Sequence, residues 1–443
     1  MSKQLENSTS SLQAHSAPVA TKHFTHLDLL LVCLGFALIL IGLFINHHVG
    51  TGRGEDLAQI YISGNAFIHG QNIFDIDTQR RIFIQETGSV PTWGMFYPPS
   101  AGIAVTYLNL FPYHVARVIW FWLMHIVLIA GFWLLCKLFF PEKSHAWRTL
   151  MIGLVLCASS IRWGFQLYQS APLIVGLLCI FLYGLYKEHP ILAITCAWYA
   201  ICIKPSIAIA FIGVLALQRK WKQIFILVCL VIITNGIGFA RMGGMEAIQG
   251  YKTNIAHLED PGKSNSLDAT ISSTQERTDW AFLLCMFGMP EKAGRIGGVI
   301  ISLLVLGVFV YAGSKWRHSY LSQEALLVFL PAILLFSMLC VYHHRYDTSM
   351  LIPVLFILLV QQPAKQSHSL SPLFYLPLFA YIFLYPVYQV QTIVIRILGY
   401  EGTVLLKGVA GIVLNIALYA SLYQLIASPP AVKVDSSKDP AVS

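Results

Sequence analysis

The polar residues most suited to chemistry in this sequence lie where long apolar runs end or are interrupted. Lys204-Pro205 interrupts the run that begins at Ala197. Proline breaks a helix and frees backbone groups, and a lysine at membrane depth needs an anion or water. A broken helix with a cation is a good anion site, so we predict that Lys204 binds a phosphate. The alternative is a lysine whose ammonium reaches the membrane surface.

Asp56 follows the glycine-punctuated segment Gly50-Thr-Gly-Arg-Gly-Glu55, directly after the first apolar run. Holding a carboxylate at the end of a bundle of hydrophobic helices costs free energy, which suggests a function for it. The simpler interpretation is a carboxylate stabilised by the N–H groups at the start of a helix. Asp75 and Asp77 are typical turn and capping residues.

Further polar side chains fall at the ends of other apolar runs. Arg162 ends one run and is either a membrane-interface anchor or a phosphate contact, and Gln169 is suited to bind a sugar or cap a turn. The cluster His343-His344-Arg345-Tyr346-Asp347 lacks further ligands at zinc spacing, so we predict no metal site. It is either a hydrated loop with an Arg–Asp pair or a phosphate or sugar contact. Aromatic residues able to stack on a sugar are Trp93, Phe96 and Tyr97.

The composition indicates a polytopic membrane protein. Of 443 residues 56% are hydrophobic and only 11% are charged, whereas soluble domains carry about 25% charged residues. Runs of about 20 apolar residues, each able to cross a bilayer as a helix, recur along the chain. The net charge of +8 comes from short basic clusters between these runs, which set orientation, so nucleic acid is not an expected partner. The nine cysteines form no ligand or disulfide pattern.

We predict an all-α fold with about twelve transmembrane helices. The expected spans are 28–46, 115–138, 147–163, 170–187, 189–203, 205–217, 222–240, 294–313, 324–342, 347–361, 371–387 and 404–426. The segments 98–112 and 390–402 are too short to span the bilayer as helices, so we expect them to be half-membrane or interfacial helices. We expect three parts: a cytoplasmic polar tail at 1–25, a transmembrane domain at 26–427 and a disordered cytoplasmic tail at 428–443.

The positive-inside rule assigns a side to each loop. A cytoplasmic N-terminus places most loop lysines and arginines inside, and the long loops 47–97 and 241–293 outside. Two amphipathic helices are expected in the first outer loop. One runs from Asp56 to Gly70 with an apolar face, and the other follows Asp77 as N-cap and ends at Gly88. Such helices lie in the membrane interface and would frame an entrance for a lipid.

Several of these motifs, in this order, resemble glycosyltransferase family 87 of the GT-C superfamily. The resemblance is clearest over 50–135. There the acidic residue after the first span is followed by the stretch Tyr61-Ile-Ser-Gly-Asn-Ala-Phe-Ile-His-Gly70-Gln-Asn-Ile-Phe-Asp75 and by Phe96-Tyr97-Pro-Pro99. A looser match includes Arg162, Gln169, Lys204-Pro205 and His343-His344. The Gly-Gln-x-Asn turn of the family stands here as Tyr168-Gln-Ser-Ala171.

The resemblance implies a GT-C-type bundle that transfers a hexose, most simply mannose, with inversion. The donor would be a polyprenyl-phosphate sugar, and the acceptor a hydroxyl of a glycan or glycolipid at the outer, periplasmic face of the inner (plasma) membrane. Asp56 would accept the proton of the hydroxyl, and Lys204, Arg345 and Arg162 would hold the phosphate without a metal or cofactor. Donor or acceptor contacts would come from His343, His344, Gln169, Tyr61 and Tyr97.

Two other functions are compatible with broken helices and large outer loops. A secondary transporter or flippase of a lipid-linked or small anionic substrate also uses broken helices and buried charges. No inverted repeat is evident in this sequence, however, and the unusual charges gather at one face. A glycan polymerase or ligase would be expected to carry an arginine-rich late loop instead of an acid after the first span.

Overall fold

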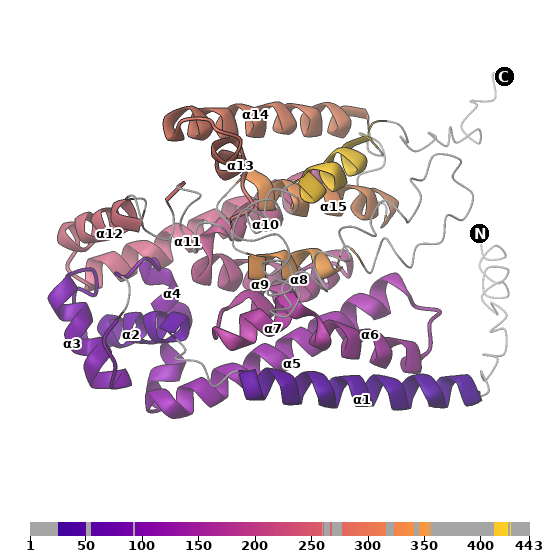
Figure 1. The fold of residues 1–443 in the computed structure, drawn as a ribbon, viewed down its shortest axis with the longest axis horizontal. Coiled ribbons are helices and arrows are strands. Elements are labelled where there is room, and N and C mark those ends of the chain that lie inside the picture. The colour runs from indigo at the N-terminus through magenta and orange to yellow at the C-terminus, as the bar shows by residue number, and fades with distance from the viewer. Residues whose placement is uncertain are drawn as a thin grey trace, which may run out of the picture.

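The computed structural model describes residues 25–49, 55–91, 94–258, 260, 266–267, 277–315, 323–340, 345–353, 355, 412–423 and 426. The elements of these residues are helices (Figure 1). In chain order they are α1 His26–Val49, α2 Glu55–His69, α3 Ile76–Thr87, α4 Pro99–Ala104, η1 Thr106–Leu110, α5 Tyr113–Phe139, α6 His145–Cys157, α7 Ser159–Gln166, α8 Ala171–Tyr186, α9 Pro190–Ile203, η2 Pro205–Ile207, α10 Ala208–Leu217, α11 Trp221–Arg241, α12 Met245–Leu258, α13 Trp280–Met286, α14 Glu291–Lys315, α15 Gln323–Cys340 and η4 Arg345–Leu351.

Four of the described helices are long and apolar enough to cross a membrane: α1, α5, α11 and α14. The pair α6 and α7 adds a fifth candidate if it is one span bent by 55° at Ala158. Shorter apolar helices occupy further expected spans: Ala171–Tyr186, Pro190–Ile203, Pro205–Leu217, Phe329–Cys340 and Ile412–Tyr423. The protein is therefore a helical membrane protein, and each of these described apolar helices overlaps an expected span. The span expected at 347–361 begins instead with the 3-10 helix η4, and 371–387 and 390–402 lie outside the described residues.

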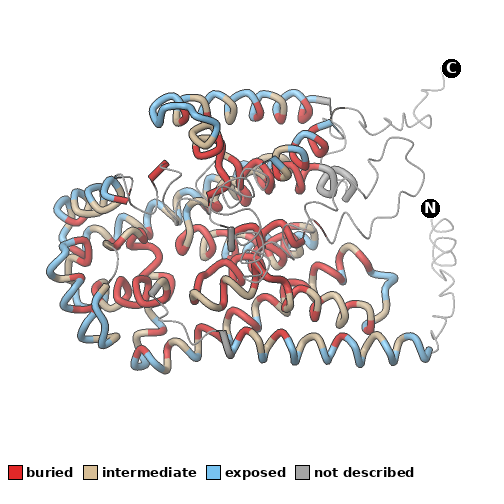
Figure 2. The backbone as a smooth tube through the Cα atoms, viewed as in Figure 1, coloured by how far each residue is buried: buried red, intermediate tan, exposed pale blue. Residues whose placement is uncertain are grey.

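The long apolar helices leave one side exposed. In Figure 2 the buried backbone gathers around α8, α9 and α10, whereas α1 and α14 are exposed along much of their length. The exposed side chains of α1 include Leu30, Leu40 and Phe44, and those of α14 include Leu303, Leu304 and Val310. Large apolar side chains turned outward on a spanning helix are typical of contact with lipid.

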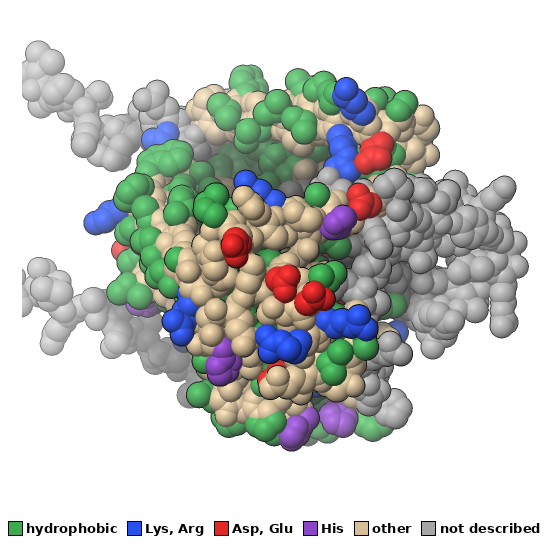
Figure 3. Space-filling view, turned by 90° about the vertical axis from the view of Figure 1, so that its left-hand side faces the viewer, with side chains coloured by type: hydrophobic (Ala, Val, Ile, Leu, Met, Phe, Trp, Pro, Cys, Tyr) green, Lys and Arg blue, Asp and Glu red, His purple; other side chains and the backbone are tan. Residues whose placement is uncertain are grey.

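Helices α2, α3 and α12 form one end of the molecule, at the left of Figure 1. The Arg241 guanidinium donates to the carbonyls of Phe67 and Ile68, each at 2.7 Å, and Asn254 donates to Phe74 O at 3.3 Å. These bonds join the segments 47–97 and 241–293, which the sequence predicted to be long loops. Figure 3 shows charged side chains of both signs over this end.

Both helices expected in the first of these loops are present, with two corrections. Helix α3 begins after Asp75, whose side chain accepts from Thr78 N at 2.9 Å, so Asp75 and not Asp77 is the N-cap. Helix α3 ends at Gly88, which has the left-handed φ of 70° that favours glycine. Helix α2 was expected to be amphipathic, but residues 57–64 are buried on every side. The apolar face reaches the core as expected, and α3, α4 and η1 cover the rest.

Helix α4 is packed closely between α2 and α11, with a glycine at each contact. A Cβ on Gly102 would lie 2.6 Å from the backbone of Ser63, and a Cβ on Gly238 would lie 2.4 Å from Pro99 Cβ. Helix α4 contains only six residues, so its position depends on its neighbours. Helix α4 also contacts α9, so it lies between the helix that carries Asp56 and the helix that ends just before Lys204.

Candidate active site

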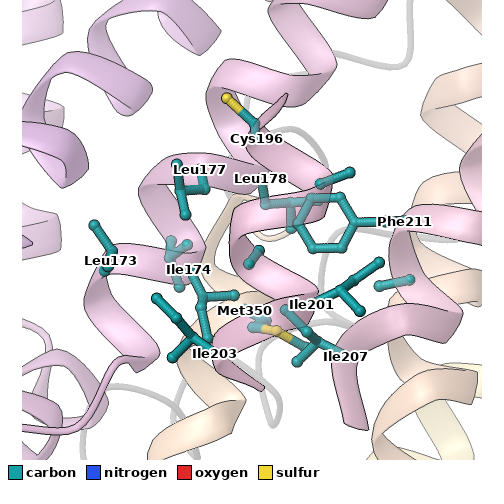
Figure 4. Close-up of a cluster of buried hydrophobic side chains, with 14 of the residues drawn as sticks. Leu173, Ile174, Leu177, Leu178, Cys196, Ile201, Ile203, Ile207, Phe211 and Met350 are labelled. Atoms are coloured by element: carbon teal, nitrogen blue, oxygen red, sulfur yellow. The ribbon is translucent and has the colours of Figure 1, made fainter. Parts of the chain in front are cut away.

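The break predicted at Lys204-Pro205 is present and lies in the middle of the core. Helix α9 ends at Ile203, Lys204 leaves the helical region at φ −140° and ψ 87°, and Pro205 starts η2. The side chains on both sides of the break, Ile203 and Ile207, are fully buried against α8 and η4 (Figure 4). The apolar packing therefore holds the backbone of Lys204 firmly, and Lys204 itself is only partly exposed.

The Lys204 ammonium forms an ion pair that joins two distant segments of the chain. Its Nζ lies 2.5 Å from Oδ1 of Asp347 on η4. The exposed fraction of the side chain is 15% for Lys204 and 2% for Asp347. A buried carboxylate is tolerated when a cation compensates its charge. The pair is therefore one unit in which the lysine faces the accessible side.

Several buried polar atoms gather on the elements around this pair. Helix α7 and the start of α8 both pack against η4. On these three elements, four buried atoms have no hydrogen-bond partner among the described residues: Ser160 Oγ, Arg162 Nε, Ser170 Oγ and Ser349 Oγ. Buried polar groups in native proteins are nearly always hydrogen-bonded, so a cluster of exceptions needs an explanation. Each of these four atoms is able to bind water or a polar ligand.

A short series of contacts links the Lys204 region to Asp56. The Ser100 hydroxyl on α4 donates to Cys202 O at 3.1 Å, two residues before Lys204. Helix α4 in turn contacts α2 where Gly64 and Gly102 meet. Asp56 lies in the first turn of α2 and is partly exposed. The only elements between the carboxylate and the ammonium along this route are α2, α4 and the end of α9.

Tyr61 supports α2 and is not displayed on the surface. It is 2% exposed, its hydroxyl donates to Phe111 O at 2.9 Å, and its ring lies 5.3 Å from that of Tyr113. Burial, and then the negative charge of Glu86, raises the pKa of the Tyr61 hydroxyl. Tyr61 is thus a protonated donor that joins α2 to the start of α5. The contact with substrate predicted for Tyr61 has no support in this geometry.

Tyr97 and Gln169 are also largely buried. Tyr97 is 7% exposed and stacks on Phe96 at 4.7 Å, immediately before α4. Gln169 is 5% exposed and follows Tyr168, whose left-handed φ of 53° makes a tight turn between α7 and α8. The Arg117 guanidinium lies 4.7 Å from the centre of the Tyr168 ring. Arg117 was not singled out in the sequence because it lies within the first turns of a long apolar helix.

The remaining predicted site residues fall outside the part of the chain that the structure describes. They are His343 and His344, together with the side chain of Arg345 and the residue Trp93. Asp347, which follows them, is the site residue that the sequence predicted least well. The sequence left open either a hydrated loop with an Arg–Asp pair or a phosphate or sugar contact there, and in the structure Asp347 pairs with Lys204, 143 positions earlier.

The described residues contain no group of three or more histidine, cysteine or acidic side chains placed to hold a metal ion. The charges in this part of the described structure are the ion pair of Lys204 with Asp347 at the helix break and, on a helix that packs against η4, Arg162 of α7. A model of glycosyltransferase family 87 matches residues 95–341, which is more than half of the chain.

The chain belongs to glycosyltransferase family 87.

The family 87 match contains Tyr97, Arg162, Gln169 and Lys204, and it ends before the 343–347 cluster. Asp56 precedes it. Comparison with curated proteins and with solved structures returned no match. Family membership makes this chain a glycosyltransferase, and its apolar helices make it a membrane enzyme.

Proposed function

We propose that this glycosyltransferase transfers a hexose, most simply mannose, from a polyprenyl-phosphate carrier to an acceptor hydroxyl at the outer membrane face, with inversion. The observation that carries the proposal is the Lys204–Asp347 pair at the α9–η2 break, with unpaired buried polar atoms on η4 and on the elements that pack against it. A phosphate on a lipid carrier needs cations inside a membrane protein, and Lys204 at the helix break is such a cation.

In the proposed reaction the acceptor oxygen attacks the anomeric carbon of the donor sugar. A new glycosidic C–O bond forms as the bond between that carbon and the phosphate oxygen breaks. The Asp56 carboxylate takes the proton from the acceptor hydroxyl, and the electron pair of the broken bond stays on the lipid phosphate. A hydroxyl is a weak nucleophile, so a positioned base contributes about 10²–10⁴-fold.

The lipid phosphate leaves with increased negative charge, which Lys204 and Arg162 stabilise. Cations fixed before the reaction lower the barrier because they need no rearrangement as charge develops. Lys204 is held by the packed break and by Asp347, and Arg162 by its place on α7 against η4. We infer that the Ser100–Cys202 bond and the Gly64–Gly102 contact position α2, which carries Asp56, relative to the end of α9.

The experiment is a donor competition with purified full-length protein in liposomes. Polyprenyl-phosphate mannose, glucose and arabinose are supplied in turn with a glycolipid acceptor extract, and donor consumption and labelled product are measured. We expect one donor to be consumed, with the polyprenyl phosphate released in equal amount. Passage of the lipid-linked sugar across the bilayer without cleavage would contradict the proposal and indicate a flippase.

A further inference from the structure

We propose that Asp347 weakens the hold of Lys204 on the lipid phosphate, so that this product leaves after sugar transfer. The inference rests on the proposed function, because it requires that Lys204 binds the phosphate of the carrier. It adds a role for a residue that touches neither reacting atom. Asp347 would act on turnover through its ion pair with Lys204.

The first observation is that Asp347 is fixed while Lys204 is accessible. Asp347 is 2% exposed, and its neighbours in η4 are buried: Ser349 at 0%, Met350 at 1% and Leu351 at 0%. Met350 lies among the apolar side chains of α8 to α10 in Figure 4. The carboxylate therefore cannot move into solvent when a phosphate arrives. A phosphate reaches the ammonium from its exposed side and shares it with Asp347.

The second observation is the sign of the charges on the two sides of the Lys204 ammonium. A carboxylate and a phosphate on opposite sides of one ammonium repel each other. Two unit charges roughly 6 Å apart, at the effective dielectric of about 20 suited to protein sites, change an equilibrium by about 100-fold. Relaxation of the lysine reduces this, so we expect about tenfold. Without the carboxylate, the partly exposed ammonium loses this opposite charge, and a bound phosphate would take its place.

This balance suits an enzyme that must release its leaving group. Without Asp347, Lys204 would bind the phosphate of the donor and the phosphate of the product equally strongly. Binding both states equally well lowers KM without accelerating the reaction, and it slows product release. The Asp347 carboxylate keeps the lysine in place for the transition state while limiting the affinity for the product.

The test measures binding of a radiolabelled short-chain polyprenyl phosphate to purified full-length protein in detergent. Four proteins are compared: wild type, Asp347→Asn, Asp347→Glu and Lys204→Met. We expect Asp347→Asn to bind the lipid phosphate about tenfold more tightly and to turn over more slowly at saturating donor. Asp347→Glu keeps the charge and should bind within about twofold of wild type. Asp347→Ser supplies a second neutral variant if the asparagine protein does not fold.

Competing ligands identify what the site recognises. A neutral polyprenol of the same length should compete equally with wild type and Asp347→Asn, and inorganic phosphate should compete better with Asp347→Asn. Unchanged or weaker lipid-phosphate binding in both neutral variants would overturn the role of Asp347. If Lys204→Met also binds the lipid phosphate normally, then Lys204 is not a phosphate ligand and the phosphate site of the proposed function fails with it.

Discussion

Replacing Gly102 by alanine tests whether the contact between α2 and α4 sets the distance between Asp56 and the cations. An added Cβ would lie 2.5 Å from Ser63 Oγ, 2.6 Å from Ser63 C and 2.7 Å from Gly64 N. Carbon contacts are normally about 3.5–4.0 Å long. Two of the three atoms belong to the backbone, so a rotamer change in Ser63 does not relieve the clash. The two helices must separate by about 1 Å.

The separation should reduce catalysis more than stability. Helix α2 carries Asp56, and α4 is bonded through Ser100 to the backbone next to Lys204. A misplacement of about 1 Å between reacting groups costs on the order of 100-fold in rate. Overpacking a well-packed contact lowers the free energy of unfolding by about 1–3 kcal/mol. We therefore expect Gly102→Ala to fold, with kcat reduced about 100-fold.

Two glycines in α11 provide matched controls. A Cβ on Gly236 would meet no atom within 4 Å, whereas one on Gly238 would lie 2.4 Å from Pro99 Cβ on the other side of α4. Gly236→Ala should keep the wild-type rate and gain up to about 1 kcal/mol, and Gly238→Ala should lose activity. Initial transfer rates and thermal unfolding are measured on all three variants. A folded Gly102→Ala protein with a rate within about threefold of wild type would refute the reasoning.

Three further predictions concern local structure and orientation. Asp75→Ala should lower the free energy of unfolding of α3 by about 1 kcal/mol and increase amide hydrogen exchange in that helix. Because the N-cap bond lowers the pKa of Asp75, wild type should keep this stability at neutral pH and lose it as the pH falls through the folded-state pKa, while Asp75→Ala shows no such change. Ser100→Ala leaves a buried carbonyl unpaired and should lower the free energy of unfolding by about 1–3 kcal/mol, whereas wild-type stability would exclude that bond. A cysteine at Ser89 should react with an impermeant thiol reagent in intact cells and one at Ser144 should not, and the reverse pattern would invert the topology.

The sequence predicted well what depends on local pattern. Apolar runs marked the helices, and Pro205 marked the α9–η2 break because a proline within an apolar run lacks the N–H that continues the helix and clashes with the preceding turn. The N-cap of α3 was misassigned because Asp75 and Asp77 are both suitable caps, and only the bond from Thr78 distinguishes them. In these cases the information lies within a few residues of the element.

The partner of Lys204 could not be predicted, because it depends on packing across the whole bundle. Asp347 ends a histidine and arginine cluster, for which the sequence offered a local Arg–Asp pair or a phosphate or sugar contact, and neither names Lys204. The burial of α2 was missed for the same reason. Its pattern shows one apolar face, but Gln59 and Ser63 on the other face are also buried, where α4 approaches through Gly102. Close glycine contacts of this kind have no periodic signal.

The most direct test of the account is the rate of sugar transfer by Asp56→Asn. The asparagine keeps the shape of the side chain but cannot accept a proton, so transfer should fall about 10²–10⁴-fold while binding of the polyprenyl-phosphate donor is unchanged. The adjacent substitution Glu55→Gln removes the same charge one residue earlier and should be nearly silent. Near-normal transfer by Asp56→Asn, in protein that still binds the donor, would mean that Asp56 is not the base and would contradict the central claim.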